Sequence, residues 1–105
     1  MPQRVFFLNK LRDSAQADEY ERWIREVDYP LARSLPAIES YVVTRLDGLL
    51  MEEGAAPYDY LEVVDITDLD EYRAALAGGP EIEEFFKQWS SFVGESVAVF
   101  GEVIE

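Results

Sequence analysis

Residues 20–45, which read YERWIREVDYPLARSLPAIESYVVTR, hold the pattern that decides the fold: a helix followed by a strand. The first half repeats apolar side chains at intervals of three and four residues, as one face of a helix does: Tyr20, Trp23, Ile24, Val27 and Leu31. Pro30 is expected to end or kink this helix, and Pro36 marks its exit. From Ile38 to Leu46, β-branched residues around Tyr41 predict a strand.

Three further strands are predicted around this unit, at residues 4–9, 58–66 and 97–104. Between the last two, apolar residues at helical spacing predict a helix that stops at Gly78 and continues after Pro80. The order β-α-β-β-α-β predicts an α+β fold, a ferredoxin-like sandwich with a four-stranded antiparallel sheet. We expect one domain over residues 1–105, with the helices on one face of the sheet.

The last strand predicts a partner for the other face. Val97, Val99 and Val103 alternate there with a second apolar set, Ala98, Phe100 and Ile104. Both faces of this strand are therefore expected to be buried. Since the helices can cover only one face of the sheet, we expect a homodimer to cover the other.

The charge balance excludes several classes of partner. The chain of 105 residues has 9 Lys and Arg against 22 Asp and Glu, a net charge of −13. Such a chain repels phosphate backbones and anionic bilayers, so neither nucleic acid nor membrane is an expected partner. No apolar run is long enough for a membrane span, and no secretory signal is recognisable at the N-terminus. The expected location is cytoplasmic.

The chain contains neither Cys nor His. It therefore lacks thiolate nucleophiles, the commonest general base and the commonest ligand of transition metals. No glycine-rich phosphate-binding motif or nucleophile-elbow motif occurs either. We expect neither a cofactor nor a metal.

Residues 23–31, WIREVDYPL, followed by Leu35-Pro36 and Tyr41, resemble the EthD-like branch of the dimeric α+β-barrel proteins. That branch often has a His two residues before the Pro, where this chain has Asp28. Chain length and the run DYPL at 28–31 are most similar to the RedY-like and HapK-like proteins, which are associated with prodigiosin-type secondary metabolism. The resemblance implies a homodimer with one cavity per subunit, between sheet and helices. The superfamily includes cofactor-free monooxygenases, cyclases and isomerases, so the fold alone does not choose a reaction.

Asp28, near the predicted end of the first helix, is the first candidate catalytic residue. If its side chain faces an apolar cavity, its pKa would rise and it could exchange a proton near neutral pH. In the alternative interpretation, it pairs with Arg25 or Arg33, or caps the turn at Pro30.

A second set of candidates lies on the two central predicted strands. Tyr41 and Arg45 share one face of their strand, and Tyr60 and Glu62 share one face of the next. If these faces coincide, the four side chains form a polar cluster in which Arg45 or Tyr41 could polarise a ligand oxygen. The alternative is a cross-strand ion pair or an interface pair.

Aromatic residues at helical spacing complete the candidates: Trp23, Phe85, Phe86, Trp89 and Phe92. Most stripes of this kind belong to the core. Some of these rings, Trp23, Phe85 and Trp89 among them, could instead bind a flat aromatic ligand.

Two functions fit these residues. The first is a cofactor-independent enzyme, of cyclase, isomerase, condensation or oxygenase type, acting on an aromatic, pyrrolic, indolic or polyketide-like intermediate. The second is a non-catalytic protein that carries a reactive intermediate. A structural dimer without a ligand is a third alternative.

Overall fold

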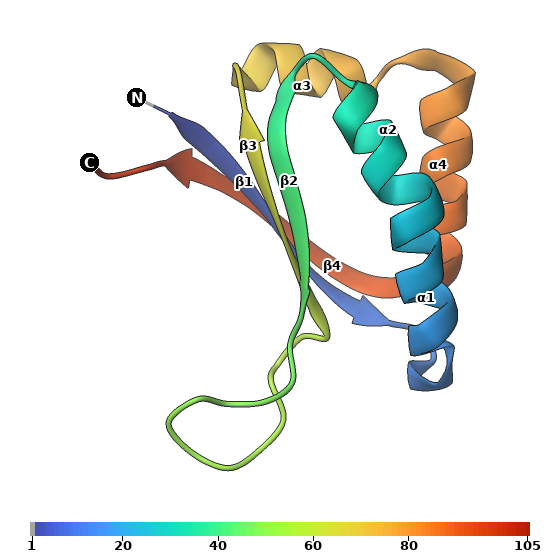
Figure 1. Cartoon of the computed structure of the whole chain (residues 1–105), viewed down its shortest axis with the longest axis vertical. Coiled ribbons are helices and arrows are strands. Elements are labelled where there is room, and N and C mark those ends of the chain that lie inside the picture. Colours follow the sequence, from blue (N-terminus) through green and yellow to red (C-terminus); the bar gives the residue numbers. More distant parts are fainter. Residues whose placement is uncertain (1) are drawn as a thin grey trace.

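The computed structural model describes residues 2–105 and joins four antiparallel strands into one sheet, with the helices gathered on one side of it (Figure 1). The elements, in chain order, are β1 (Gln3–Leu11), η1 (Ser14–Gln16), α1 (Ala17–Trp23), η2 (Ile24–Asp28), α2 (Tyr29–Ser34), β2 (Ile38–Arg45), β3 (Tyr60–Ile66), α3 (Leu69–Leu76), α4 (Gly79–Phe92) and β4 (Val93–Glu102). The sheet order is β2-β3-β1-β4. The predicted ferredoxin-like α+β fold is confirmed. Among the described helices, none is both long and apolar enough to cross a bilayer.

The side of the sheet that faces the helices carries the core. Residues paired across antiparallel strands point to the same face, so Glu62 of β3 lies beside Val43 of β2 and Phe7 of β1. Two clusters of buried residues pack on this face. One surrounds Val64 and Tyr72, and the other surrounds Tyr20 and Trp23. Three polar or charged side chains are buried with them: Asn9, Asp28 and Glu62.

The first helix does not end at Pro30, contrary to one expectation from the sequence. The chain widens into the π-helical segment η2, in which the N–H of Tyr29 donates to the carbonyl of Ile24, five residues back. Pro30 follows this wide turn, so its missing N–H falls where the regular pattern of helical hydrogen bonds is already interrupted. The helix continues to Ser34, so Asp28 lies inside it rather than near its end.

The prediction that the helices bury one face of β4 is wrong, because Phe100, on the helix side, is 55% exposed. Val99, on the face that a second copy is expected to cover, is also exposed in the single chain. The reason is connectivity, because β4 is an edge strand and α4 runs directly into its first residue, Val93. The helix covers Val93 and leaves the rest of the strand open.

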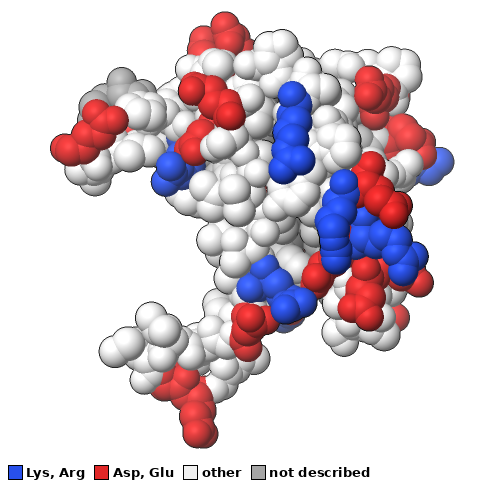
Figure 2. Space-filling model, in the orientation of Figure 1, with Lys and Arg blue, Asp and Glu red and all other residues white. Residues whose placement is uncertain are grey.

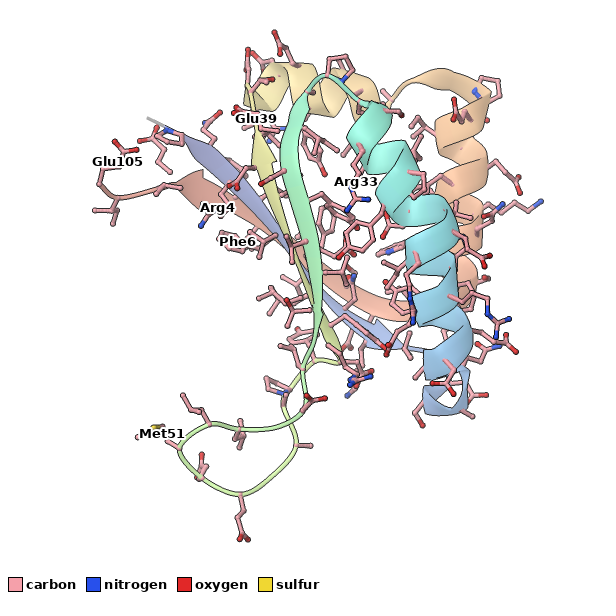
Figure 3. All side chains as sticks on the ribbon, viewed as in Figure 1. Arg4, Phe6, Arg33, Glu39, Met51 and Glu105 are labelled. Atoms are coloured by element: carbon pink, nitrogen blue, oxygen red, sulfur yellow. The ribbon has the colours of Figure 1, made fainter. Side chains whose placement is uncertain are left out.

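The middle of the sheet face opposite the helices is apolar, with the ion pair of Arg4 and Asp65 beside it. In Figure 3 the labelled Phe6 points away from the helices, toward this face. The pairing register aligns Val42, Val63 and Val99 in one row with it. Figure 2 shows this side of the molecule hollowed.

Beside that face, the loop between β2 and β3 forms an arm over residues 46–59 that extends away from the sheet (Figure 1). Two backbone hydrogen bonds join its two sides, from the N–H of Leu46 to the carbonyl of Asp59 and from the N–H of Leu49 to the carbonyl of Gly54, and the N–H of Asp59 donates to the carbonyl of Asn9 in β1. Leu50 and Met51 near its tip are 94% and 91% exposed.

Candidate functional site

Tyr41 joins two buried carboxyl groups. Its hydroxyl lies 2.6 Å from Oδ2 of Asp28 and 2.7 Å from Oε1 of Glu62. A phenol has one proton, so it can donate to only one carboxylate. The second hydrogen bond forms only when the other carboxyl is protonated and donates to the phenol oxygen. With both bonds in place, the pair therefore holds one shared proton besides that of Tyr41.

Asn9 fixes the far side of Glu62. Its side-chain nitrogen donates to Oε2 of Glu62, and its oxygen accepts a hydrogen bond of 2.6 Å from the hydroxyl of Ser96. Asn9 is fully buried. Sequence reasoning missed this residue, which ends the predicted first strand. The signal was the alternation along β1, because Asn9 shares a face with Val5 and Phe7.

Burial changes the acid–base behaviour of the pair. Asp28 is 2% exposed and Glu62 is 6% exposed. Desolvation, helped by the charge of Glu62, raises the pKa of Asp28 to about 7, against the hydrogen bond from Tyr41. Desolvation also raises the pKa of Glu62, against its hydrogen bonds from Tyr41 and Asn9. The pKa of Tyr41 is raised by burial and by both carboxyls, so the phenol keeps its proton.

The side chain of Asp28 thus faces the cavity, as the first interpretation of the sequence requires, and forms no ion pair with Arg25 or Arg33. Its hydrogen-bond partner is Tyr41. Arg33 instead lies over the ring of Tyr29, with the guanidinium carbon 4.8 Å from the ring centre.

A cavity of about 50 Å³ lies against this pair, between the sheet and the helices. Its lining residues are Phe7, Asp28, Leu31, Ala32, Leu35, Ile38, Tyr41, Glu62, Tyr72, Leu76, Ile82, Phe85, Phe86 and Trp89. This volume suffices for a few water molecules and is too small for an aromatic ring, so a ring enters only if side chains that line the cavity move. An open groove of about 420 Å³ between α2 and α4 shares Leu31 and Phe85 with the cavity, so these side chains separate the two spaces.

We expect Phe85→Ala to join the groove to the cavity. The ring of Phe85 is only half-buried and packs on Trp23 at 5.1 Å between ring centres. Its removal should raise the association rate of a small aromatic such as benzyl alcohol several-fold, as followed by stopped-flow Trp fluorescence. Ser34→Ala is the matched control, since Ser34 lines the groove and does not line the cavity. An unchanged rate in Phe85→Ala would mean that ligands enter elsewhere.

The polar cluster predicted on the central strands is divided in two. Tyr41 and Glu62 meet at Asp28. Arg45 is 60% exposed and pairs with Glu21 and Asp47, outside the cavity. The hydroxyl of Tyr60 also donates to Glu21, at 2.7 Å. The four side chains of the predicted cluster do share one face of the sheet. Arg45 and Tyr60 are neighbours at one end of β2 and β3, and there both contact Glu21 of α1.

The predicted aromatic residues are divided in the same way. Phe85 and Trp89 line the cavity. Trp23 belongs to the core cluster around Tyr20, and its indole N–H donates to Gln88 at 2.8 Å. It does not line the cavity.

Known proteins share this fold over almost the whole chain. HapK from Hahella chejuensis is 29% identical, with a TM-score of 0.77 over 97% of this chain and 92% of that one. An EthD family protein from Bacillus halodurans C-125 is 21% identical, with a TM-score of 0.73 over 99% and 100%. A dimeric ferredoxin-like protein of unknown function from Thermobifida fusca is also 21% identical, with a TM-score of 0.71 over 98% and 92%. No curated protein matches the chain.

A family model described as "REDY-like protein HapK" matches residues 3–104. This match spans the sheet, the helices and every residue of the carboxyl site. The resemblance found from the segment around Asp28 is confirmed. The chain belongs to the REDY-like HapK family.

Proposed function

We propose that this protein is a cofactor-independent enzyme that moves a proton on an aromatic, pyrrolic or indolic intermediate of secondary metabolism. The observation that carries the proposal is the phenol of Tyr41 between two buried carboxyls, at the wall of a mainly apolar cavity. Cyclisation, isomerisation and condensation all need a proton removed from one atom and returned to another. A mainly apolar cavity that holds one conformation of the substrate and excludes water once it is bound would favour one of these reactions over its competitors.

Asp28 is the proposed proton carrier. A pKa of about 7 leaves both its acid and its base form populated near neutral pH, which suits a general acid–base group. The carboxylate takes a proton from the substrate, and the resulting acid returns it to another atom, so the enzyme is restored. An oxygenase-type reaction would begin with the same removal and would consume dioxygen as a second substrate.

Tyr41 is the proposed donor to a substrate oxygen or nitrogen, because its protonated hydroxyl lies beside the carrier. Arg45 lies outside the cavity, so it has no part in this role. Phe85 and Trp89 supply ring faces for the substrate.

The alternative is a non-catalytic carrier that holds a reactive intermediate away from water. The absence of His and Cys and the small volume of the cavity favour it. A carrier needs the shape and polarity of the cavity and has no need for an ionisable group at position 28.

The test compares the wild type with Asp28→Asn. Trp fluorescence follows titration with pyrrolic, indolic and polyketide-like aromatics, and chromatography follows product. At saturating ligand, we expect turnover at least about 100-fold lower in Asp28→Asn, as for loss of a general acid–base group. Asp18→Asn, which removes the same charge from the surface, should keep wild-type turnover. Equal binding by both proteins with no product from either would favour the carrier.

We further propose that the protein works as a homodimer in the cytoplasm, closed through the apolar sheet face that carries Phe6. Several structures of the same fold, including the one from Thermobifida fusca, are described as dimeric. The arm lies beside that face (Figure 1), and its exposed tip, at Leu50 and Met51, would contact the second copy.

A further inference from the structure

The buried carboxyl pair has no positively charged partner within the described residues. Neither Lys nor Arg lines the cavity. The ion pairs of residues 2–105 join Arg4 and Arg45 to carboxylates nearer the surface. Ionised carboxyls are costly to bury without a counter-charge, and the shared proton at Tyr41 removes part of this cost. The site therefore lacks one positive charge whenever that proton leaves.

The walls of the cavity suit a particular kind of positive charge. Five aromatic rings line it besides that of Tyr41: Phe7, Tyr72, Phe85, Phe86 and Trp89. Aromatic faces attract cations, and most strongly those with a desolvated, spread charge. Small inorganic cations instead need a shell of oxygen ligands. Within residues 2–105, no three acidic side chains come together to form one.

The groove that leads to the cavity is negatively charged, like the carboxyl pair inside it. Glu81 and Glu84 of α4 line the groove between α2 and α4, and no basic residue lines it. A ligand that enters through this groove meets negative charge at the entrance and again at the carboxyl pair.

We propose that the ligand carries a protonated nitrogen on an aromatic body, as an amine, iminium or protonated heterocycle, and that this cation replaces the shared proton between Asp28 and Glu62. The inference rests on the proposed function and narrows its substrates to cationic ones. Aromatic carboxylates and phosphates are excluded as ligands, because their charge would add to that of the pair.

Proton release should accompany binding. The titratable groups that face Asp28 are the carboxyl of Glu62 and the phenols of Tyr20, Tyr41 and Tyr72. All three phenols have raised pKa values, so the exchangeable proton belongs to the carboxyls. With a pKa of about 7 for Asp28, a cation should bind about tenfold more tightly at pH 8 than at pH 6.

The experiment uses three probes with one ring and different charge: benzylamine, benzyl alcohol and benzoate. Trp fluorescence and calorimetry give their dissociation constants at pH 6 and pH 8, in moderate salt to screen the net charge of −13. We expect benzylamine to bind at least about tenfold more tightly than benzyl alcohol at pH 8, and benzoate not to bind. In Glu62→Gln this ratio should fall below about twofold. Glu52→Gln, in the exposed arm, should keep the wild-type ratio.

Each result has a distinct meaning. Benzyl alcohol or benzoate binding as tightly as benzylamine would overturn the cation inference and leave the proposed function standing. A preference for benzylamine that persists in both Glu62→Gln and Asp28→Asn would also overturn it, because the attraction would then come from the surface. If none of the probes binds to the wild type or to Phe85→Ala, the cavity is not a ligand site, and both proposals fail.

Discussion

The free energy of unfolding is expected to fall by roughly 2–3 kcal/mol as the pH rises from 5 to 8, because Asp28 is buried. Its pKa is about 7 in the folded chain, whereas the ordinary value of 3.8 applies to the unfolded chain. Between these values the folded state binds more protons, so raising the pH favours unfolding. The raised pKa of Glu62 acts in the same direction.

Other carboxyls do not cancel this slope. A hydrogen bond from Tyr60 is the main cause that lowers the pKa of Glu21, and a hydrogen bond from Arg4 is the main cause that lowers the pKa of Asp65. A lowered pKa gives stability that is lost only as the pH falls through the acidic range, below the window of the measurement.

Urea denaturation of the wild type, Asp28→Asn and Asp18→Asn across pH 5–8 checks this prediction. Asp28→Asn should flatten the slope and gain stability relative to the wild type at pH 8, because an amide carries no charge to bury. Asp18→Asn should keep the wild-type slope, since Asp18 is exposed. Equal slopes in all three proteins would contradict the assignment of a shared proton to the Asp28 site.

Phe6→Glu is expected to abolish the proposed dimer. Phe6 lies in the apolar row with Val42, Val63 and Val99, on the face away from the helices. Burying an unpaired carboxylate costs about 3 kcal/mol or more, and a two-fold interface contains the change twice. The sum, about 6 kcal/mol, weakens the dimer by more than about 10⁴-fold.

Sedimentation equilibrium with matched circular dichroism measures this effect. Ala74→Glu adds the same charge to an exposed position of α3 and should leave the dimer intact. A dimeric Phe6→Glu would place the interface on another surface. A monomeric wild type would contradict the proposed homodimer itself.

Periodic patterns predict this fold well, because they reflect burial directly. The stripe from Tyr20 to Leu31 and the β-branched run after Ile38 both form regular elements. The effect of Pro30 differs from the local rule, since that rule assumes a regular α-helix and the chain widens one turn instead. Whether a helix covers β4 is not predictable in this way, because the apolar alternation along a strand does not show where the neighbouring helix lies or ends.

The site is predicted in part, for a related reason. Alternation along the strands places Tyr41 and Glu62 on the helix side, where they meet Asp28. The same alternation places Arg45 there too, but a long side chain at the end of a strand reaches carboxylates outside the cavity, here Glu21 and Asp47. The closure of the cavity by Leu31 and Phe85 depends on how α2 and α4 pack, which no single segment encodes.

The π-helical segment η2 has a consequence for how chains of this fold can diverge. It amounts to one inserted residue in a helix whose start is anchored by Tyr20 and whose end leads through Ala37 to β2. Deleting one residue within η2 would restore a regular helix and leave the residues on either side close to their present orientation, because the wide turn absorbs the extra residue. If the deleted residue is Asp28, the anchoring rings keep their places and the buried carboxyl is lost. A single-residue deletion is thus a simple route by which a relative could lose the buried acid and keep its architecture.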